Sequence, residues 1–237
     1  MGHAKLKILE TYEPSPIPPG SMVESEGDTH IFNGIEWQPL RGRDLGHSLQ
    51  TYGGRFIWPL DPYVDEIDYL SVAHGLACEM RYGNQSPYPL PVAWHSVALS
   101  HVVPQKYAQA ALIHDAAEAF LKDMPRPIRR QEPFKSIYDA IEDKLLRVCF
   151  DYFDVDYALM DDEFKYYDIK MSWCEMTVWA RTSPVFEAKL AGLHLSTPER
   201  IEDSQDQDYI KWVERCPRHE MWQSAEKAWL ERYDELF

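Results

Sequence analysis

The feature that most constrains this chain is an apolar run at residues 110–120, AALIHDAAEAF, which contains two adjacent polar side chains, His114 and Asp115. The alanine, leucine and isoleucine residues around them predict a helix buried in the interior. Burying an imidazole and a carboxylate costs free energy unless each is paired or bound to a cation. We therefore expect a partner for this pair, and a divalent metal ion is the leading candidate.

The composition is that of an ordinary globular chain with an acidic surface. The 237 residues are 45% hydrophobic and 13% aromatic, which suffices for one sizeable core. The formal net charge of −15 argues against a broad surface for nucleic acid or anionic membranes, because both need clustered Lys and Arg. A small anionic substrate in a locally basic pocket stays compatible with this charge.

The cysteines and the N-terminus are typical of an intracellular protein. The four cysteines are far apart and form no C-x-x-C pair, which is typical of reduced, mostly buried thiols. The N-terminus becomes acidic and proline-rich before a signal-peptide core could form. No apolar run reaches the length of a membrane span, so we expect a protein of the cytoplasm.

Two regions of the chain differ in their pattern. Residues 1–50 are expected to form an irregular extension that packs on the domain, with a short hairpin at residues 31–37 around Asn33 and Gly34. Residues 51–237 carry apolar residues at helical spacing and almost no strand signals, which predicts an all-α helical bundle. The expected helices cover residues 64–81, 91–103, 107–121, 134–153, 160–182 and 208–236.

Helical spacing places a second histidine opposite the first. Pro104 interrupts the pattern, so the helices on either side of it should be antiparallel neighbours joined by a tight connection. His95 and His114 lie at nearly equal distances from that connection and should therefore be level with each other. Asp115 is about 100° around the helix from His114, and Glu118 lies one turn further along the face of His114.

A further ligand must come from a later segment. Asp168 ends an acidic run at residues 151–168 and is the best placed carboxylate, although its spacing fits a solvated helix face equally well. Two imidazoles and two carboxylates suit one Mn, Co, Ni, Zn or Fe ion better than Ca, with Mg as a further candidate. Such a set leaves coordination positions open for water and substrate.

These residues resemble the H…HD…D signature of the HD-domain metal-dependent phosphohydrolases, over the chain from about residue 53 to the end. The sequence HDAAEAFLKDMPRP at 114–127 is similar to the subgroup of 5′-deoxynucleotidases and of phage- or prophage-encoded dNTP triphosphohydrolases. The segments at 54–62 and 93–97 look closest to the phage branch, which includes dATP triphosphohydrolases. The resemblance implies an HD-type helical bundle for residues 51–237, in the host cytoplasm if a phage encodes it.

The resemblance also implies roles for individual residues. Glu118 would be the catalytic acid or base, Asp123 would contact the sugar 3′-hydroxyl and Lys165 would contact phosphate. The alarmone hydrolases of this superfamily carry Glu-Asp after the dyad, whereas Ala119 follows Glu118 here, which disfavours hydrolysis of ppGpp. One divalent ion would be bound by four residues, namely His95, His114, Asp115 and Asp168.

Other cations and one aromatic residue are candidates for binding substrate. An acidic chain must balance phosphate charge locally, although each of these basic side chains could equally be solvated. In the stiff loop at 54–62, Arg55 could pair with phosphate and Trp58 could stack on a base, or both could simply pack within the loop. The basic candidates near the motif are Lys122, Arg126 and Arg129, in addition to Lys165.

The expected function is metal-dependent hydrolysis of deoxynucleotides, most directly by attack at the α-phosphorus of a dNTP such as dATP. The nearest alternative is a 5′-deoxynucleotidase that releases phosphate from dNMPs. A non-catalytic sensor that binds nucleotide and a structural metal site in an interaction protein are two further alternatives. The expected partner is a small-molecule nucleotide, with no nucleic-acid polymer and no membrane, and the resemblance implies a homo-oligomer.

Overall fold

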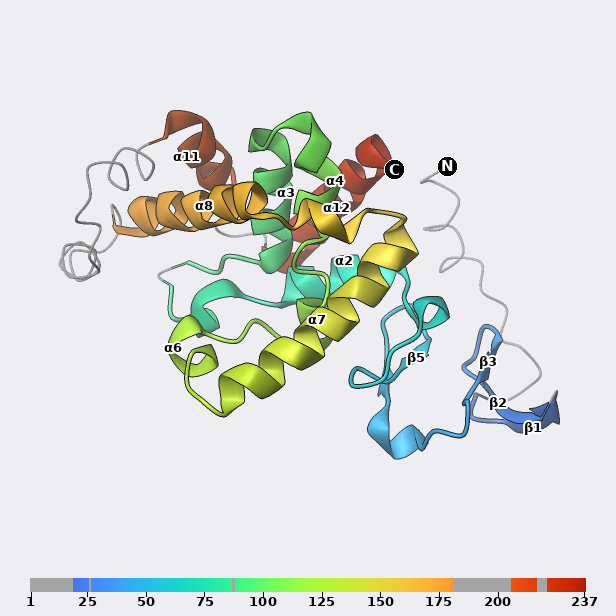
Figure 1. The fold of residues 1–237 in the computed structure, drawn as a ribbon. Coiled ribbons are helices and arrows are strands. Elements are labelled where there is room, and N and C mark those ends of the chain that lie inside the picture. The colour runs from blue at the N-terminus through green and yellow to red at the C-terminus, as the bar shows by residue number, and fades with distance from the viewer. Residues whose placement is uncertain (1–18, 26, 87, 181–205, 217–220) are drawn as a thin grey trace.

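The computed structural model describes residues 19–25, 27–86, 88–180, 206–216 and 221–237. Within these residues the chain is mainly helical, as expected, but small antiparallel sheets near the N-terminus make the all-α description too narrow (Figure 1). The strands are β1 (Met22–Ser25), β2 (Asp28–Phe32), β3 (Trp37–Pro39), β4 (Leu49–Gln50) and β5 (Phe56–Ile57).

The predicted hairpin is present between β2 and β3, which pair as antiparallel neighbours. The side-chain Oδ1 of Asn33 accepts hydrogen bonds from the backbone N–H groups of Ile35 and Glu36, each at 2.9 Å. Gly34 adopts a φ of 105°, in the region that favours glycine. The Asn-Gly signal therefore acts through its ordinary turn chemistry.

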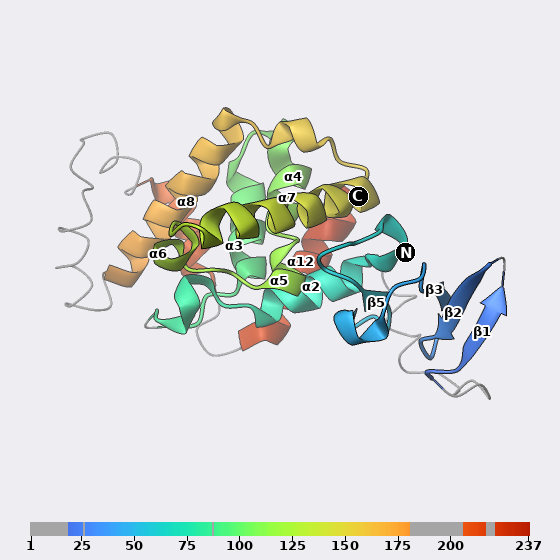
Figure 2. The same cartoon turned by 60° about the horizontal axis from the view of Figure 1, so that its bottom comes forward.

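Two other strand pairings were not expected from the sequence. All four residues of β1 are exposed, and β4 and β5 contain only two residues each, so none shows a recognisable apolar alternation. Because β4 pairs with β5, the expected boundary at residue 50 falls between two paired strands. Figure 2 shows β1, β2 and β3 at one end of the molecule, beside the helical body.

A buried carboxylate, that of Glu66 in the 3₁₀ helix η2 (Val64–Glu66), ties the N-terminal segment to the helical body. Its Oε1 accepts hydrogen bonds from Arg41, at 3.3 Å, and from Arg43. The guanidinium of Arg43 also lies 3.9 Å from the ring centre of Trp58. Two arginines from the extension thus compensate one charge at the start of the helical region.

The helix α3 (Val92–Val102) lies at the centre of the helical body, because every residue from 92 to 100 is buried. The helices around it are seen in Figures 1 and 2. No helix among the described residues is long and apolar enough to cross a bilayer. The helices that pack against α3 are α2 (Tyr69–Cys78), α4 (Ala108–Ile113), α8 (Asp162–Ala180), α11 (Gln207–Glu214) and α12 (Met221–Leu236).

Most of the predicted helices occur near their predicted positions. The helix α7 (Phe134–Phe153) covers the predicted range and ends at Asp154, which is left-handed with a φ of 54°. The helix predicted at 64–81 begins later, because Asp68 caps α2 by accepting a hydrogen bond from the N–H of Ser71 at 2.7 Å. Residues 181–182 of the predicted helix 160–182 lie outside the described residues, as do residues 217–220 between α11 and α12.

The helix predicted at 107–121 is divided in two. After α4, residues 114–117 form tight turns with i to i+3 hydrogen bonds, such as that from the N–H of Glu118 to the carbonyl of Asp115 at 2.8 Å. The chain then enters α5 (Glu118–Leu121) and continues to α6 (Arg126–Arg129). Gly75 of α2 allows α5 to approach, since a Cβ there would lie 2.7 Å from the Cβ of Ala119.

We predict that Glu66→Ala lowers the free energy of unfolding by about 3 kcal/mol, because it leaves two arginines without their buried partner. Asp65→Ala is the matched control, since Asp65 pairs with the same Arg41 but its side chain is 53% exposed. That variant should lose less than about 1 kcal/mol. Urea unfolding followed by circular dichroism measures both, and equal losses would contradict the role of Glu66.

Candidate metal centre

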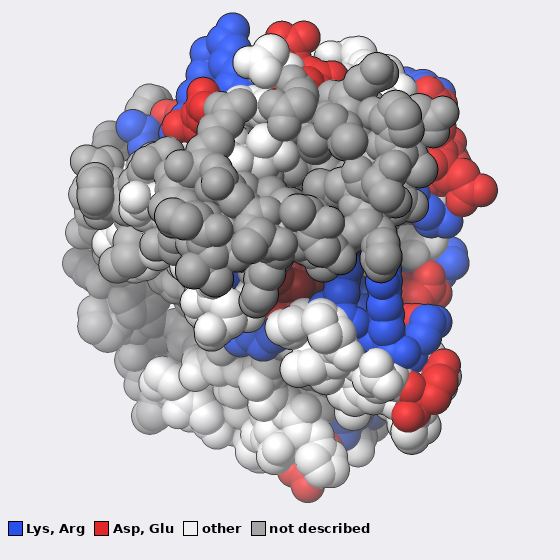
Figure 3. All heavy atoms as spheres, turned by 90° about the vertical axis from the view of Figure 1, so that its left-hand side faces the viewer, with Lys and Arg blue, Asp and Glu red and all other residues white. Residues whose placement is uncertain are grey.

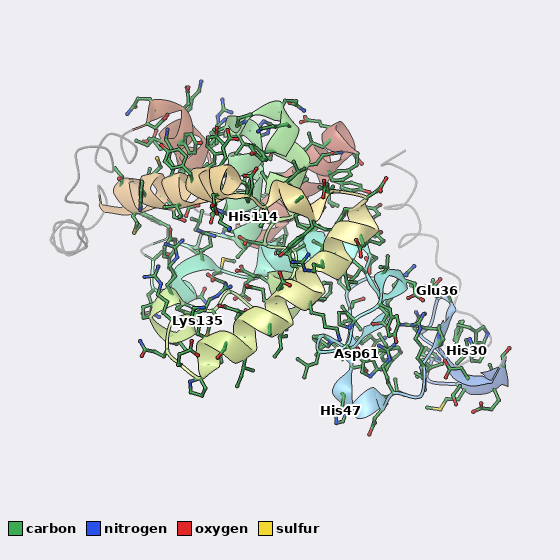
Figure 4. All side chains as sticks on the ribbon, in the orientation of Figure 1. His30, Glu36, His47, Asp61, His114 and Lys135 are labelled. Carbon is green, nitrogen blue, oxygen red and sulfur yellow. The ribbon has the colours of Figure 1, made fainter. Side chains whose placement is uncertain are left out.

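Three helical segments bring the predicted metal ligands together. His95 lies on α3, His114 and Asp115 lie in the turn after α4, and Asp168 lies on α8. The imidazole rings of His95 and His114 face one another with their centres 5.2 Å apart. Figure 4 shows His114 inside the helical body, close to α8.

The donor atoms of these residues converge on one point. One donor atom each from His95, His114 and Asp115 lies within 4.8 Å of the others, which is a separation that a single metal ion can bridge. Asp168 lies beside them, with its Oδ1 3.1 Å from Nε2 of His95 and 3.8 Å from Nε2 of His114. The four residues named from the sequence therefore form one cluster.

The hydrogen bonds of His114 make its Nε2 available as a ligand. Its Nδ1–H donates to the backbone carbonyl of Ala111 at 2.8 Å, which leaves the lone pair on Nε2. That nitrogen is buried and has no hydrogen-bond partner among the described residues. An oxygen of Asp115 lies 3.1 Å away, but its direction does not suit a hydrogen bond. A metal ion would satisfy this orphaned atom, so the residues present fit one.

Two residues of the centre were not recognised from the sequence. The fully buried Glu175 lies 2.6 Å from Nδ1 of His95 through its Oε1. Arg81 reaches Oε2 of Glu175 with its Nε at 3.1 Å and comes within 3.6 Å of Asp115. The spacing of Glu175 could have revealed it, because it lies seven residues after Asp168 and hence on the same helix face. Arg81 was expected at the end of the helix predicted at 64–81, but α2 ends at Cys78 and Arg81 begins the 3₁₀ helix η3 (Arg81–Asn84), so helical spacing gave no sign of its contact with Glu175.

The pKa values in the cluster reflect a balance between burial and neighbouring charges. Burial and the charge of Arg81 lower the pKa of His95, but the carboxylates of Glu175 and Asp168 outweigh them and raise it to about 9. Burial raises the pKa of Asp168, yet its hydrogen bond to His95 and the charge of His114 bring it below the ordinary value. Without a metal, the proton on the imidazole of His95 therefore compensates part of the negative charge of the carboxylates.

Glu118 has a pKa that is shifted in the opposite direction to that of Asp168. Its side chain is buried, and its Oε2 has no hydrogen-bond partner among the described residues. Burial, together with the negative charges of Asp115 and Asp123, raises its pKa well above the ordinary value for a glutamate. A carboxyl group whose pKa is raised in this way is suited to act as a general acid.

A cavity of about 170 Å³ adjoins the cluster. Arg129 and Lys165 supply its positive charges, but Arg129 is already paired with Asp139 at 3.1 Å and with Glu142. The Nζ of Lys165 lies 3.1 Å from Asp162 and is largely exposed. The residues that line the cavity are His114, Asp115, Ala117, Glu118, Arg129, Glu142, Leu146, Met160, Phe164, Lys165 and Asp168.

Three further predicted substrate contacts lie outside the cavity lining. Lys122 adopts a φ of 84° and pairs with Glu79 at 2.8 Å. Asp123 is partly buried and accepts a hydrogen bond from the N–H of Tyr82 at 3.2 Å. Arg126 is exposed on α6.

Arg55 and Trp58 are not brought to the cavity. The guanidinium of Arg55 pairs with Glu36 at 3.1 Å and also donates to the backbone carbonyl of Asp65. Trp58 is buried, and its indole N–H donates to the backbone carbonyl of Asp44 at 2.8 Å. Of the two roles considered for Trp58, the structure shows packing within the N-terminal region, where its ring lies against the guanidinium of Arg43.

Comparisons with known proteins find similarity to uncharacterized bacterial proteins. No protein-family model matches it. It is 30% identical over 123 residues to the uncharacterized protein YfdR of Escherichia coli, a match that covers 52% of this chain and 67% of the relative. It is 34% identical over 85 residues to the uncharacterized protein RCAP_rcc00048 of Rhodobacter capsulatus, covering 32% of this chain and 43% of that protein.

We predict that metal binding at pH 7.5 releases about one proton per site. The raised pKa of His95, about 9, means that its imidazole is protonated in the metal-free protein, and only the neutral ring can bind a metal. The affinity should therefore rise with pH and level off above pH 9. Calorimetric titration of Zn²⁺ in buffers with different ionisation enthalpies measures the release, and a heat independent of the buffer would contradict it.

Proposed function

We propose that this chain, which belongs to the same family as the uncharacterized Escherichia coli protein YfdR, is a divalent-metal-dependent phosphohydrolase that acts on deoxynucleotides. The observation that carries the proposal is the buried donor set of His95, His114 and Asp115 beside a cavity that also contains Glu118. A set of metal ligands and a carboxyl group of raised pKa at one cavity are the components needed for hydrolysis by an activated water.

The residues that would hold the metal are His95, His114, Asp115 and Asp168. The mixed nitrogen and oxygen donors favour Mn, Co, Ni, Zn or Fe, with Mg as a further candidate. When bound, such an ion supplies a coordinated water of lowered pKa and a positive charge beside a phosphoryl oxygen.

The side chains of the cavity have separate tasks in this proposal. The buried carboxyl group of Glu118, whose pKa is raised by burial, can transfer a proton to the leaving oxygen. Arg129 and Lys165 can donate N–H groups to phosphate oxygens. The apolar side chains of Leu146 and Phe164 form part of the wall and strengthen these charge interactions by limiting the access of water.

The resemblance of residues 114–127 to deoxynucleotidases and dNTP triphosphohydrolases supports the substrate class. Within it, attack at the α-phosphorus of a dNTP, dATP or a related purine, is the reaction that the resemblance favours. Lysine and arginine side chains that gather beside an acidic recess, in the view of Figure 3, are compatible with an anionic substrate despite the net charge of −15.

A 5′-deoxynucleotidase is the second candidate, and one observation favours it. The cavity is small and its lining contains only two cations, of which Arg129 is already paired with carboxylates. Four carboxylates line the same space, so a monophosphate would be easier to neutralise there than a triphosphate.

The experiment that tests the proposal is a panel of dNTPs and dNMPs with Mn²⁺, Co²⁺, Zn²⁺ and Mg²⁺, with the products separated by chromatography. Release of triphosphate from dNTPs supports the first reaction, and release of phosphate from dNMPs alone supports the second. Binding of nucleotide without turnover in every condition would replace the enzymatic proposal with that of a sensor.

We predict that Glu118→Gln lowers kcat by at least about 100-fold, because the amide cannot transfer the proton. Affinity for Mn²⁺, measured by calorimetry, should stay within a few-fold of the wild type, since Glu118 is not a proposed ligand. The control is Glu226→Gln, which removes a carboxylate paired with His74 outside the cavity. Unchanged turnover by Glu118→Gln would contradict the assigned role.

A further inference from the structure

We propose that Glu175 is a positioning residue of the metal centre and that Arg81 couples it to the ligand Asp115. This inference rests on the proposed function only in taking the cluster of His95, His114 and Asp115 as the metal site. The evidence is a chain of contacts that runs from the fully buried His95 and Glu175 through the partly buried Arg81 to the partly buried Asp115.

The carboxylate of Glu175 is enclosed by hydrogen-bond donors. Its Oε1 lies 2.6 Å from Nδ1 of His95, and its Oε2 accepts from Nε of Arg81 at 3.1 Å and from the hydroxyl of Tyr82 at 2.8 Å. The residue is fully buried on α8, where an apolar side chain would pack without desolvating a charge. Because buried ionic networks of this kind add little net stability, orientation of His95 explains the carboxylate better than stability does.

The contact with Glu175 determines which nitrogen of His95 can bind a metal. A neutral imidazole that donates from Nδ1 carries its lone pair on Nε2. Nε2 of His95 lies 3.1 Å from Oδ1 of Asp168, so it faces the other proposed metal ligands. Carboxylates that hold a ligating histidine in this way fix the ring and raise its basicity.

Arg81 joins two of the segments that carry ligands. Its Nη2 donates to the hydroxyl of Ser172 at 3.0 Å and its Nε to Glu175, both on α8. Its Nη1 lies 3.6 Å from Asp115 in the turn after α4. A shift of α8 or of the turn after α4 would therefore move the guanidinium of Arg81. Through this side chain the position of Asp115 is coupled to that of Glu175 and hence of His95.

The strained residues after Arg81 contribute to the same network of contacts around Glu175. Tyr82, Gly83 and Asn84 all have positive φ values near 60°, which is unfavourable for two of the three residues. In this conformation the hydroxyl of Tyr82 reaches Glu175 while its N–H reaches Asp123. Tyr82 thus connects Glu175, which positions His95, to Asp123, the residue expected to contact the sugar. These two contacts are a physical reason for the strained backbone.

The test compares Glu175→Gln with Glu226→Gln, which disrupts a histidine–carboxylate pair of the same kind, 3.1 Å long, at His74. In Glu175→Gln one carboxylate oxygen becomes an amide NH₂ group. Because the N–H groups of His95 and Arg81 each point at one oxygen of the carboxylate, this NH₂ group must face another donor and cannot accept its hydrogen bond. Calorimetric titration with Mn²⁺ should show a 10- to 100-fold loss of affinity for the first variant and none for the second. Glu175→Asp should recover part of the affinity, and the visible spectrum of bound Co²⁺ should change in Glu175→Gln.

The outcomes separate this inference from the proposed function. A wild-type protein that fails to bind Mn²⁺ would overturn both, whereas normal binding by both wild type and Glu175→Gln would overturn only the role of Glu175. If Glu175→Gln does not fold, histidine ¹⁵N NMR of the zinc-loaded wild type decides the matter. Protonated Nδ1 and metal-bound Nε2 at His95 are expected, and coordination through Nδ1 would refute the proposal.

Discussion

The structure depends on compensating charge inside an apolar interior. His95 and Glu175 are fully buried and His114 nearly so, and burying these groups without partners would cost free energy. The contacts among α3, α8 and the turn after α4 provide those partners. Among the described residues, Nε2 of His114 and Oε2 of Glu118 have no hydrogen-bond partner, and these are the two atoms to which the proposed function assigns metal binding and proton transfer.

The geometry of the backbone changes where His114 and Asp115 lie. α4 ends before His114, tight turns cover residues 114–117 and α5 begins at Glu118, and the side chains of His114 and Glu118 both line the cavity. The small Gly75 lets α5 pack directly against α2. Glu66 plays a comparable part at the other end, where its buried charge holds Arg41 and Arg43 and with them the N-terminal segment.

Much of the helical fold could be predicted because its signals are local. The periodicity over 134–153, the capping residue Asp68 and the Asn33–Gly34 turn each act through neighbours a few residues away. The missed strands β1, β4 and β5 are short and lack alternation, and their pairing is decided by distant segments. Trp58 illustrates the same limit. Its loop sequence is compatible both with an exposed indole that stacks on a base and with a buried indole in the core, and only distant contacts decide between them.

The sequence by itself determined which side chains could act as ligands, since an imidazole and a carboxylate in a buried helix require compensation wherever they lie. It also determined that His95 and His114 would be level, because a tight connection fixes the register of two antiparallel helices. Only the tertiary structure decided that Glu175 and Arg81 support them and that Arg55 stays away from the cavity. Those contacts join residues far apart in the chain, and their distances follow from how whole helices pack.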